Sequence, residues 1–142
     1  MKSAALQQAI FTRLNDASVT ALLSTAYAPL STIFTDVPQS ADPEKESDFP
    51  IVVIGEGTIT PYDTKDSVGG SALVQIDVWD RATSMLDLKA VCDAIDARLR
   101  RQALTISGAT HITTELETVT FARDPDGKTK RALILYRVLW LT

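Results

Sequence analysis

The spacing of apolar residues changes along this chain and divides it into a helical first part and a mostly β remainder. Apolar residues recur every four positions from Leu6 to Leu14, which predicts an amphipathic helix with Ser3 as its N-cap. Asp16 or Ser18 is suited to cap a second, shorter helix. Pro29 ends the helical region, because the residue before a proline avoids the helical conformation.

Several short segments after this region have the composition or the period of strands. A short extended piece is expected at Ile33–Thr35, and the β-branched run Pro50–Gly55 is apolar on both faces, which is typical of a buried strand. Apolar and polar residues alternate from Ala72 to Trp79, the period of two of a strand. A short strand and turn are expected at Leu104–Gly108.

The strongest helical signal follows Ser84, which we expect to be an N-cap. Apolar residues after it recur at alternating steps of three and four, so they share one face. We expect this face to pack against Ile51 or Val53 and the even-numbered side chains of 72–78. The face consists of Met85, Leu88, Cys92, Ile95 and Leu99.

The last third of the chain predicts a long β-hairpin. Extended runs over 112–123 and 131–141 flank Asp124–Gly127, a strong turn signal. The apolar positions of the first run change parity, which predicts a β-bulge near Glu117 or Thr118. The chain is therefore expected to be one α+β domain over residues 1–142. Its mostly antiparallel sheet would have four to five strands, with two to three helices packed on one face.

The final strand is apolar on both faces. Ala132 to Trp140 supply one face at alternate positions, and the other carries Leu133, Leu135, Leu139 and Leu141 around Arg137. Two explanations stay open: loops or the third helix cover the second face, or another copy of the chain does. If another copy covers this face, the candidate self-assembly interface consists of Leu133, Leu135 and Leu139.

Composition and charge exclude several classes of protein. Lys plus Arg number 14 and Asp plus Glu 18, a net charge of −4, which disfavours both a nucleic-acid-binding domain and an anionic lipid surface as partner. A single cysteine excludes an intrachain disulfide, and no apolar run is long enough to span a membrane. We expect a soluble protein of a reducing compartment.

The residues that commonly perform catalysis or bind metals are few. His111 is the only histidine and Cys92 the only thiol, and Cys92 falls on the apolar helix face. Asp77 and Asp80 fall on opposite faces of their strand, so they cannot act as an acid–base pair. The sequence therefore predicts no enzyme, no metal and no cofactor.

Three polar connections are candidate contacts to partners: 36–48 with its acidic run, 61–70, and the hairpin tip 124–128. The candidate residues in them are Val37, Gln39, Glu44, Asp48, Asp63, Lys65, Asp66, Asp126 and Lys128.

Four segments in this order and spacing resemble the tail-completion or tail-terminator family of long-tailed DNA phages. They are Ala9–Leu14, Ile33–Ala41 with its Val-Pro-Gln, Phe49–Glu56, and Val74–Arg81 with its Asp-Val-Trp-Asp-Arg. The resemblance covers nearly the whole chain, and the acidic stretch Asp42–Asp48 is longer than the family pattern.

The resemblance implies a structural protein without catalytic residues. Such a protein forms a ring, commonly a hexamer, at the head-proximal end of the tail tube, where it ends tube polymerisation and meets the head connector. The implied partners are other copies of the chain, the tail-tube protein and the connector, with DNA only as passing cargo and no membrane. The implied location is the virion neck, after assembly in the host cytoplasm. Alternatives are a small-molecule-binding or regulatory α+β domain, or a head-closure protein of the same neck.

Overall fold

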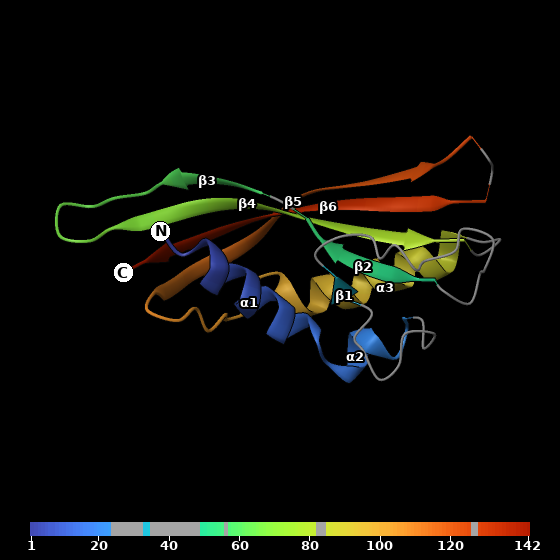
Figure 1. Ribbon diagram of the computed structural model, residues 1–142, viewed down its shortest axis with the longest axis horizontal. Helices are drawn as coiled ribbons and strands as arrows, with labels where there is room; N and C mark the ends of the chain where they lie inside the picture. The colour runs from blue at the N-terminus through green and yellow to red at the C-terminus, as the bar shows by residue number, and fades with distance from the viewer. Residues whose placement is uncertain (24–32, 35–48, 56, 82–84, 126–127) are drawn as a thin grey trace.

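The structure is a computed structural model that describes residues 1–23, 33–34, 49–55, 57–81, 85–125 and 128–142. It is an elongated, strongly twisted sheet with its helices on one face (Figure 1). The side of the sheet that faces the helices is called the inner face below, and the opposite side the outer face.

The helices are α1 (Ser3–Leu14), α2 (Ala17–Thr20) and α3 (Met85–Leu99). Asp16 caps α2 as predicted, because its carboxylate accepts hydrogen bonds from the Ser18 amide at 3.0 Å and the Ser18 hydroxyl at 2.7 Å. The prediction of Ser3 as a cap is wrong by one residue. The Leu6 amide already donates to the Lys2 carbonyl at 2.8 Å, which makes Lys2 the N-cap. Ser84 lies outside the described residues.

Within the described residues, five strands form an antiparallel sheet, and a sixth, very short strand joins it in parallel. The strands are β1 (Ile33–Phe34), β2 (Ile51–Ile54), β3 (Thr58–Pro61), β4 (Gly69–Asp80), β5 (Thr110–Arg123) and β6 (Lys130–Leu141). Their order is β1-β2-β4-β6-β5, and β3 pairs with β4 beside β2. This confirms the α+β class with a long C-terminal hairpin, here β5–β6.

Two strand predictions are corrected. The predicted connection 61–70 is shorter in the structure, because β3 ends at Pro61 and β4 begins at Gly69. Residues 104–108 form a turn but no strand. The Leu104 amide donates to a side chain instead of to a neighbouring strand: its acceptor is His111 Nδ1, at 3.3 Å.

The predicted bulge is confirmed, because the register of β5 against β6 shifts between Leu116 and Thr118. A second shift lies between His111 and Thr113. The shift between Leu116 and Thr118 keeps Leu116, Val119 and Phe121 on the inner face despite their change of parity, whereas Ile112, at the other shift, is 46% exposed.

The core lies between the helices and the inner face. Leu88, Cys92, Ile95 and Leu99 are buried there as predicted, and Met85 is partly buried. The β2 partners of this face are Val52 and Ile54, not Ile51 or Val53. β2 is apolar on both faces, so its pairing with β4, Val52 opposite Val78 and Ile54 opposite Ile76, decides which residues point inward.

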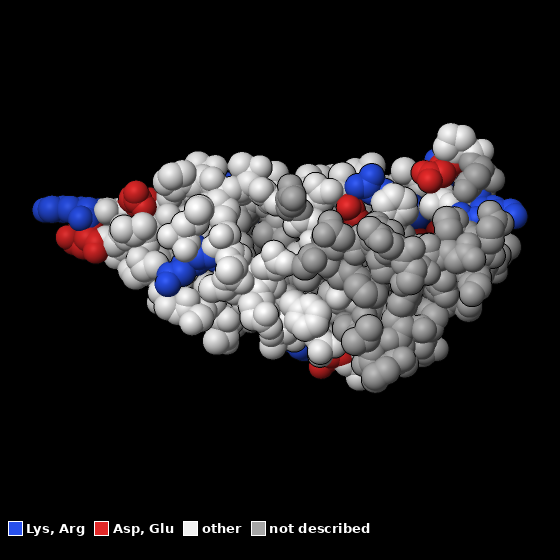
Figure 2. Space-filling view, viewed as in Figure 1, with Lys and Arg blue, Asp and Glu red and all other residues white. Residues whose placement is uncertain are grey.

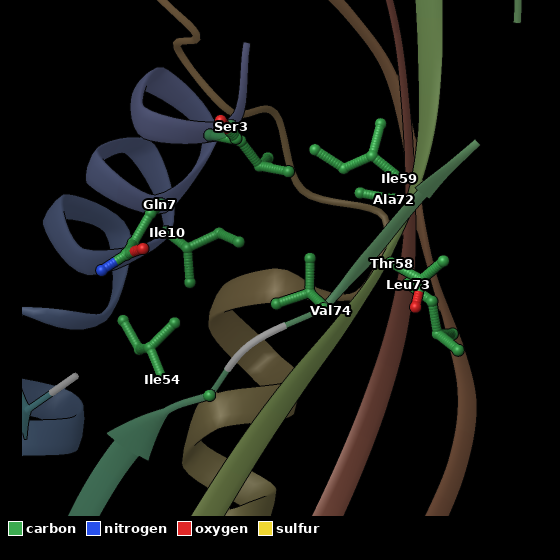
Figure 3. Close-up of a pocket in the computed structure, with 12 residues that line it drawn as sticks. Ser3, Gln7, Ile10, Ile54, Thr58, Ile59, Ala72, Leu73 and Val74 are labelled. Atoms are coloured by element: carbon green, nitrogen blue, oxygen red, sulfur yellow. The ribbon is translucent and has the colours of Figure 1, made fainter. Parts of the chain in front are cut away.

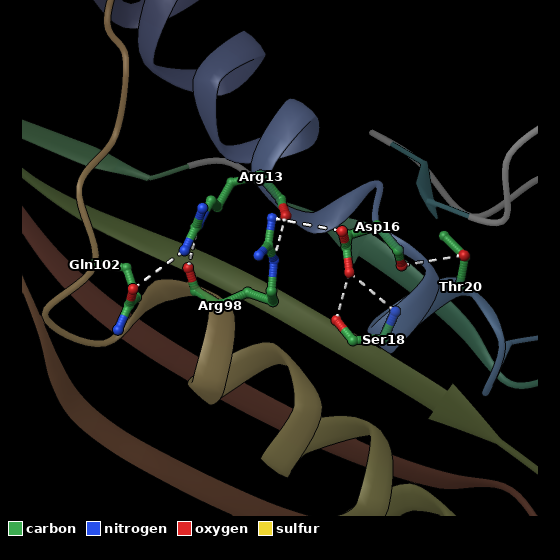
Figure 4. Close-up of polar contacts among 6 residues, drawn as sticks. All are labelled: Arg13, Asp16, Ser18, Thr20, Arg98 and Gln102. Atoms are coloured by element: carbon green, nitrogen blue, oxygen red, sulfur yellow. Dashed lines mark hydrogen bonds and ion pairs between the residues drawn. The ribbon is translucent and has the colours of Figure 1, made fainter.

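Two arginines connect the C-terminal ends of α1 and α3 by hydrogen bonds (Figure 4). Arg13 Nε donates to the Arg98 carbonyl at 2.8 Å, and Arg98 Nε donates to the Arg13 carbonyl at 3.0 Å. Arg98 also lies 3.8 Å from the Asp16 carboxylate. Each guanidinium therefore satisfies a terminal carbonyl of the other helix and opposes its negative end.

Candidate assembly interface

The two faces of β6 differ in their exposure. Its inner side chains, Ala132, Ile134, Tyr136, Val138 and Trp140, are all at most 2% exposed. Its outer side chains, Leu133, Leu135, Arg137, Leu139 and Leu141, are only partly buried. Helix α3 packs on the inner face, so of the alternatives left open by the sequence, cover of the outer leucines by the third helix is wrong.

The outer leucines form a narrow stripe with polar neighbours on both sides. Leu135 lies between Gln75 of β4 and Thr118 of β5, and Leu133 lies between Asp77 and Thr120. Leu139 has the same surroundings, with Ser71 on one side and Thr113 on the other. An apolar centre within a polar rim is the usual anatomy of a protein–protein interface.

Charges on the outer face are paired within the chain. Arg131 contacts the Asp77 carboxylate at 3.1 Å, and its guanidinium lies 5.0 Å from the centre of the Trp79 ring. Arg137 contacts Glu117 at 2.6 Å and the Ser71 hydroxyl at 3.1 Å. These arginines and carboxylates are therefore already paired before any partner covers the face. Pairing lowers the free-energy cost of removing water from the charged groups.

Two hairpins extend from opposite ends of the molecule (Figure 1). The tip between β3 and β4 carries the exposed residues Asp63, Lys65 and Asp66, and its shape is fixed by the Gly69 amide, which donates to the Asp63 carboxylate at 3.1 Å. Figure 2 shows charged side chains gathered at both ends, with a largely uncharged middle on that side.

The candidate contact residues are therefore spread over distant parts of the fold. Exposed Lys128 belongs to the opposite hairpin, between β5 and β6. Val37, Gln39, Glu44, Asp48 and Asp126 lie outside the described residues.

The surroundings of Cys92 and His111 are those of residues with a structural role rather than a catalytic one. Burial raises the pKa of the Cys92 thiol to about 12, so it stays protonated at neutral pH. The His111 ring accepts from the Leu104 amide through Nδ1, and its Nε2 lies 2.8 Å from the Thr114 hydroxyl. Burial lowers the pKa of this histidine, which keeps it neutral.

No group of three His, Cys, Asp or Glu residues that could hold a metal exists in the part of the chain that the structure describes. Asp77 pairs with Arg131 on the outer face, whereas Asp80 lies three positions further along β4, on the inner side. Catalytic acid–base chemistry between them has no geometric support. No helix in the described segments is long and apolar enough to cross a membrane.

A hollow lies between α1 and the β2–β4 region (Figure 3). Its volume is about 130 Å³, well below the usual size of ligand pockets, and its centre is lined by Ile10, Ile54 and Val74. The polar side chains at its border are Ser3, Gln7 and Thr58, none of them ionisable. This hollow gives little support to the small-molecule-binding alternative.

Strand β3 and the edge position of β5 are two features that the sequence pattern did not predict. The alternation of polar and apolar residues in Thr58-Ile59-Thr60 is a signal that could have indicated β3. The edge position of β5 is a property of the strand order, which a local pattern does not contain.

A family model and a known phage protein both match most of this chain. The family model for tail completion protein gp17 matches residues 8–140. The tail completion protein gp17 of Bacillus phage SPP1 is 30% identical over 112 residues, which span 79% of this chain and 81% of that protein.

The fold is also similar to that of a chain in the solved virion of a native gene transfer agent particle. The TM-score is 0.82 at 20% identity, over 99% of this chain and 98% of that one.

Proposed function

The chain belongs to the tail completion protein gp17 family, and from this premise we propose that it forms a ring at the head-proximal end of a phage tail tube. There it ends polymerisation of the tube and joins the tail to the head. It is a structural component of the virion neck, assembled in the host cytoplasm. Its role is mechanical, and no catalytic step is part of it.

The leucine stripe of β6 carries the self-assembly part of the proposal. Leu133, Leu135 and Leu139 are apolar and partly exposed, on a face without any described helix, while every inner side chain of the same strand is buried. A neighbouring copy that packs against this stripe would bury it. One head-to-tail interface repeated around an axis closes into a ring, and six copies match a tube of sixfold symmetry.

The two hairpins support contacts with partners on opposite sides. The β3–β4 tip with Asp63, Lys65 and Asp66 is one candidate, and the β5–β6 tip with Lys128 is the other. We propose that these ends meet the tail-tube protein and the head connector. Val37, Gln39, Glu44, Asp48 and Asp126 complete the proposed contact set. The net charge of −4 suits a ring through which DNA passes without binding.

The test is electron microscopy of particles produced without this protein. Overlong or unattached tails beside DNA-filled heads are expected, and the wild-type gene supplied in trans should restore joined particles. Normal, infectious particles in its absence would contradict the proposal.

The leucine stripe is tested separately with Leu133→Gln/Leu135→Gln. This variant should fold and yet fail to restore joined particles, because a polar side chain weakens an apolar contact. Leu86→Gln is the matched control: Leu86 is 74% exposed on α3 and lies off the outer face. Equal restoration by both variants would exclude the stripe as an interface.

A further inference from the structure

The open side of β5 is divided into two halves with different properties. β5 ends the sheet, so one side of its backbone faces away from β6. In the first half, the chain itself approaches this side: the Arg101 amide donates to the Thr114 carbonyl at 2.8 Å, and Arg101 pairs with Glu115 at 3.3 Å. Thr114 is buried, opposite Val138 on the inner face.

The second half, Thr118–Ala122, has no such cover. Apart from the ladder to β6, no backbone hydrogen bond to these five residues occurs within the described ranges of the chain. Thr118, Thr120 and Ala122 are exposed, and Phe121 is 41% exposed. We call Thr118–Ala122 the open segment of β5.

The composition of the open segment is unusual for a free edge. Soluble proteins protect exposed edge strands with charges, prolines or bulges. The open segment, Thr-Val-Thr-Phe-Ala, holds no charge and no proline, and it begins only after the second bulge of β5. Four of its five residues, two threonines, a valine and a phenylalanine, have high β-propensity, so the segment is suited to pair with another strand.

Strand β3, on the opposite side of the sheet from β5, is suited to pair with the open segment. Among the strands that the structure describes, only β4 pairs with β3, and the β3 residues Thr58, Thr60 and Pro61 are exposed. Since β3, β4, β6 and β5 follow one another with antiparallel pairing, β5 of one copy beside β3 of the next would again be antiparallel.

The side chains also match across such a joint. Ile59 of β3 and Val119 and Phe121 of β5 point to the inner face, as their partners Ala72, Ile134 and Ala132 show. Thr58 and Thr60 point to the outer face, as do Thr118 and Thr120. A joint that continues the sheet therefore places apolar beside apolar side chains and threonine beside threonine, both favourable cross-strand pairs.

We propose that the open segment of β5 pairs with β3 of a second copy of this chain, so that the sheets of neighbouring copies join edge to edge. This inference rests on the proposed ring. It adds a backbone contact beside the leucine stripe, because Thr118 and Thr120 are the direct β5 neighbours of Leu135 and Leu133. The contact is head-to-tail, since it joins two different borders of the sheet, and such a contact closes into a ring when its rotation allows. Such a joint pairs the open segment of β5 and the edge of β3, and so removes two free edges from each copy.

The test is a disulfide between neighbouring copies. Thr60→Cys/Thr120→Cys and Thr60→Cys/Thr118→Cys cover the two nearest registers that keep both threonines on the outer face, each in a Cys92→Ala background. Facing residues of antiparallel strands are close enough for a disulfide. Within one copy, β4 and β6 separate β3 from β5, about 14 Å over three strand spacings, so any bond must join two copies.

Oxidised particles or isolated rings should give a covalent ladder at multiples of the 15.4 kDa chain for at least one of the two pairs. Thr60→Cys/Thr105→Cys is the matched control: Thr105 is exposed in the connection before β5, and no ladder is expected. A dimer from Thr120→Cys alone would indicate two-fold pairing of β5 with itself, and a bond to a different protein would indicate another occupant. Either result overturns the inference.

Amide hydrogen exchange provides a second readout on the unmodified chain. The outward amides of 118–122 should exchange quickly in the free chain and slowly in the assembled particle, since pairing protects them. If joined particles need the protein but these amides stay unprotected and no ladder forms, the inference fails and the ring proposal stands. If particles lacking the protein are normal, the ring proposal itself fails.

Discussion

Strand β6 has an apolar residue at almost every position, yet its two faces have different surroundings. On the inner face, Tyr136 and Trp140 are at most 2% exposed beneath the helix layer. On the outer face, Leu133 and Leu135 are partly exposed between polar neighbours. The comparison shows that the inner face is buried within the single chain, whereas the outer face, on which the proposed interface lies, is not. Substitutions on the two faces should therefore separate stability from assembly.

The largest loss of stability is expected for Leu88→Ala in the helix layer. Leu88 is 0% exposed, so its truncation removes buried apolar area and leaves a cavity. The free energy of unfolding should fall by about 2–5 kcal/mol, measured by urea denaturation. An unchanged value would contradict the assignment of this helix face to the core.

The next largest loss is expected for Arg98→Met, which keeps most of the side-chain length and removes the guanidinium. The variant loses the hydrogen bond to the Arg13 carbonyl and the contact with Asp16. Because Arg98 is partly exposed, we expect a loss of about 1–2 kcal/mol. Arg100→Met, which breaks an exposed pair with Asp96, is the control and should cost less than about 0.5 kcal/mol.

A smaller loss is expected for Tyr136→Phe on the inner face. The Tyr136 hydroxyl donates to the Asp96 carboxylate at 2.9 Å, and its removal should cost about 0.5–1.5 kcal/mol. Tyr62→Phe, at a tyrosine that is 48% exposed, should leave the unfolding free energy unchanged.

Tyr136 also predicts a pH dependence. Burial, followed by the hydrogen bond to Asp96, raises the pKa of Tyr136 above its ordinary value of 10.0. The unfolded chain therefore loses this proton first, and the stabilisation present below pH 10 is lost as the pH rises above it. Wild type should lose more stability than Tyr136→Phe above pH 10 in parallel urea titrations; equal losses would contradict the assignment.

The smallest effect on the free chain is expected for Leu135→Ala on the outer face. Its side chain is only partly buried, so the same truncation as in Leu88→Ala should cost less than about 1 kcal/mol. A loss as large as that of Leu88→Ala would show that the outer face is already covered in the single chain, and would remove the distinction between the two faces.

Local patterns determined much of this fold. The parity change in the apolar positions of 112–121 was sufficient to predict the bulge at Leu116/Thr118, because the side-chain period of a strand is two. The three- and four-residue spacing likewise predicted which side of α3 is buried. Asp16 was identifiable as a cap because its carboxylate acts on an amide only two residues away.

Long-range pairing decided what these patterns left open. β2 is apolar at every position, so only its register against β4 turned Val52 and Ile54, rather than Ile51 and Val53, toward the helices. The leucines of β6 were identified from the sequence, but helix α3 packs on the opposite face, and this packing is what leaves them accessible. The open segment of β5 exists because strands distant in sequence place β5 at the end of the sheet. Hydrophobic periodicity is a property of neighbouring residues and follows from the sequence alone. The face that a helix covers and the strand that stays at an edge depend on contacts between distant segments, which only the tertiary structure specifies.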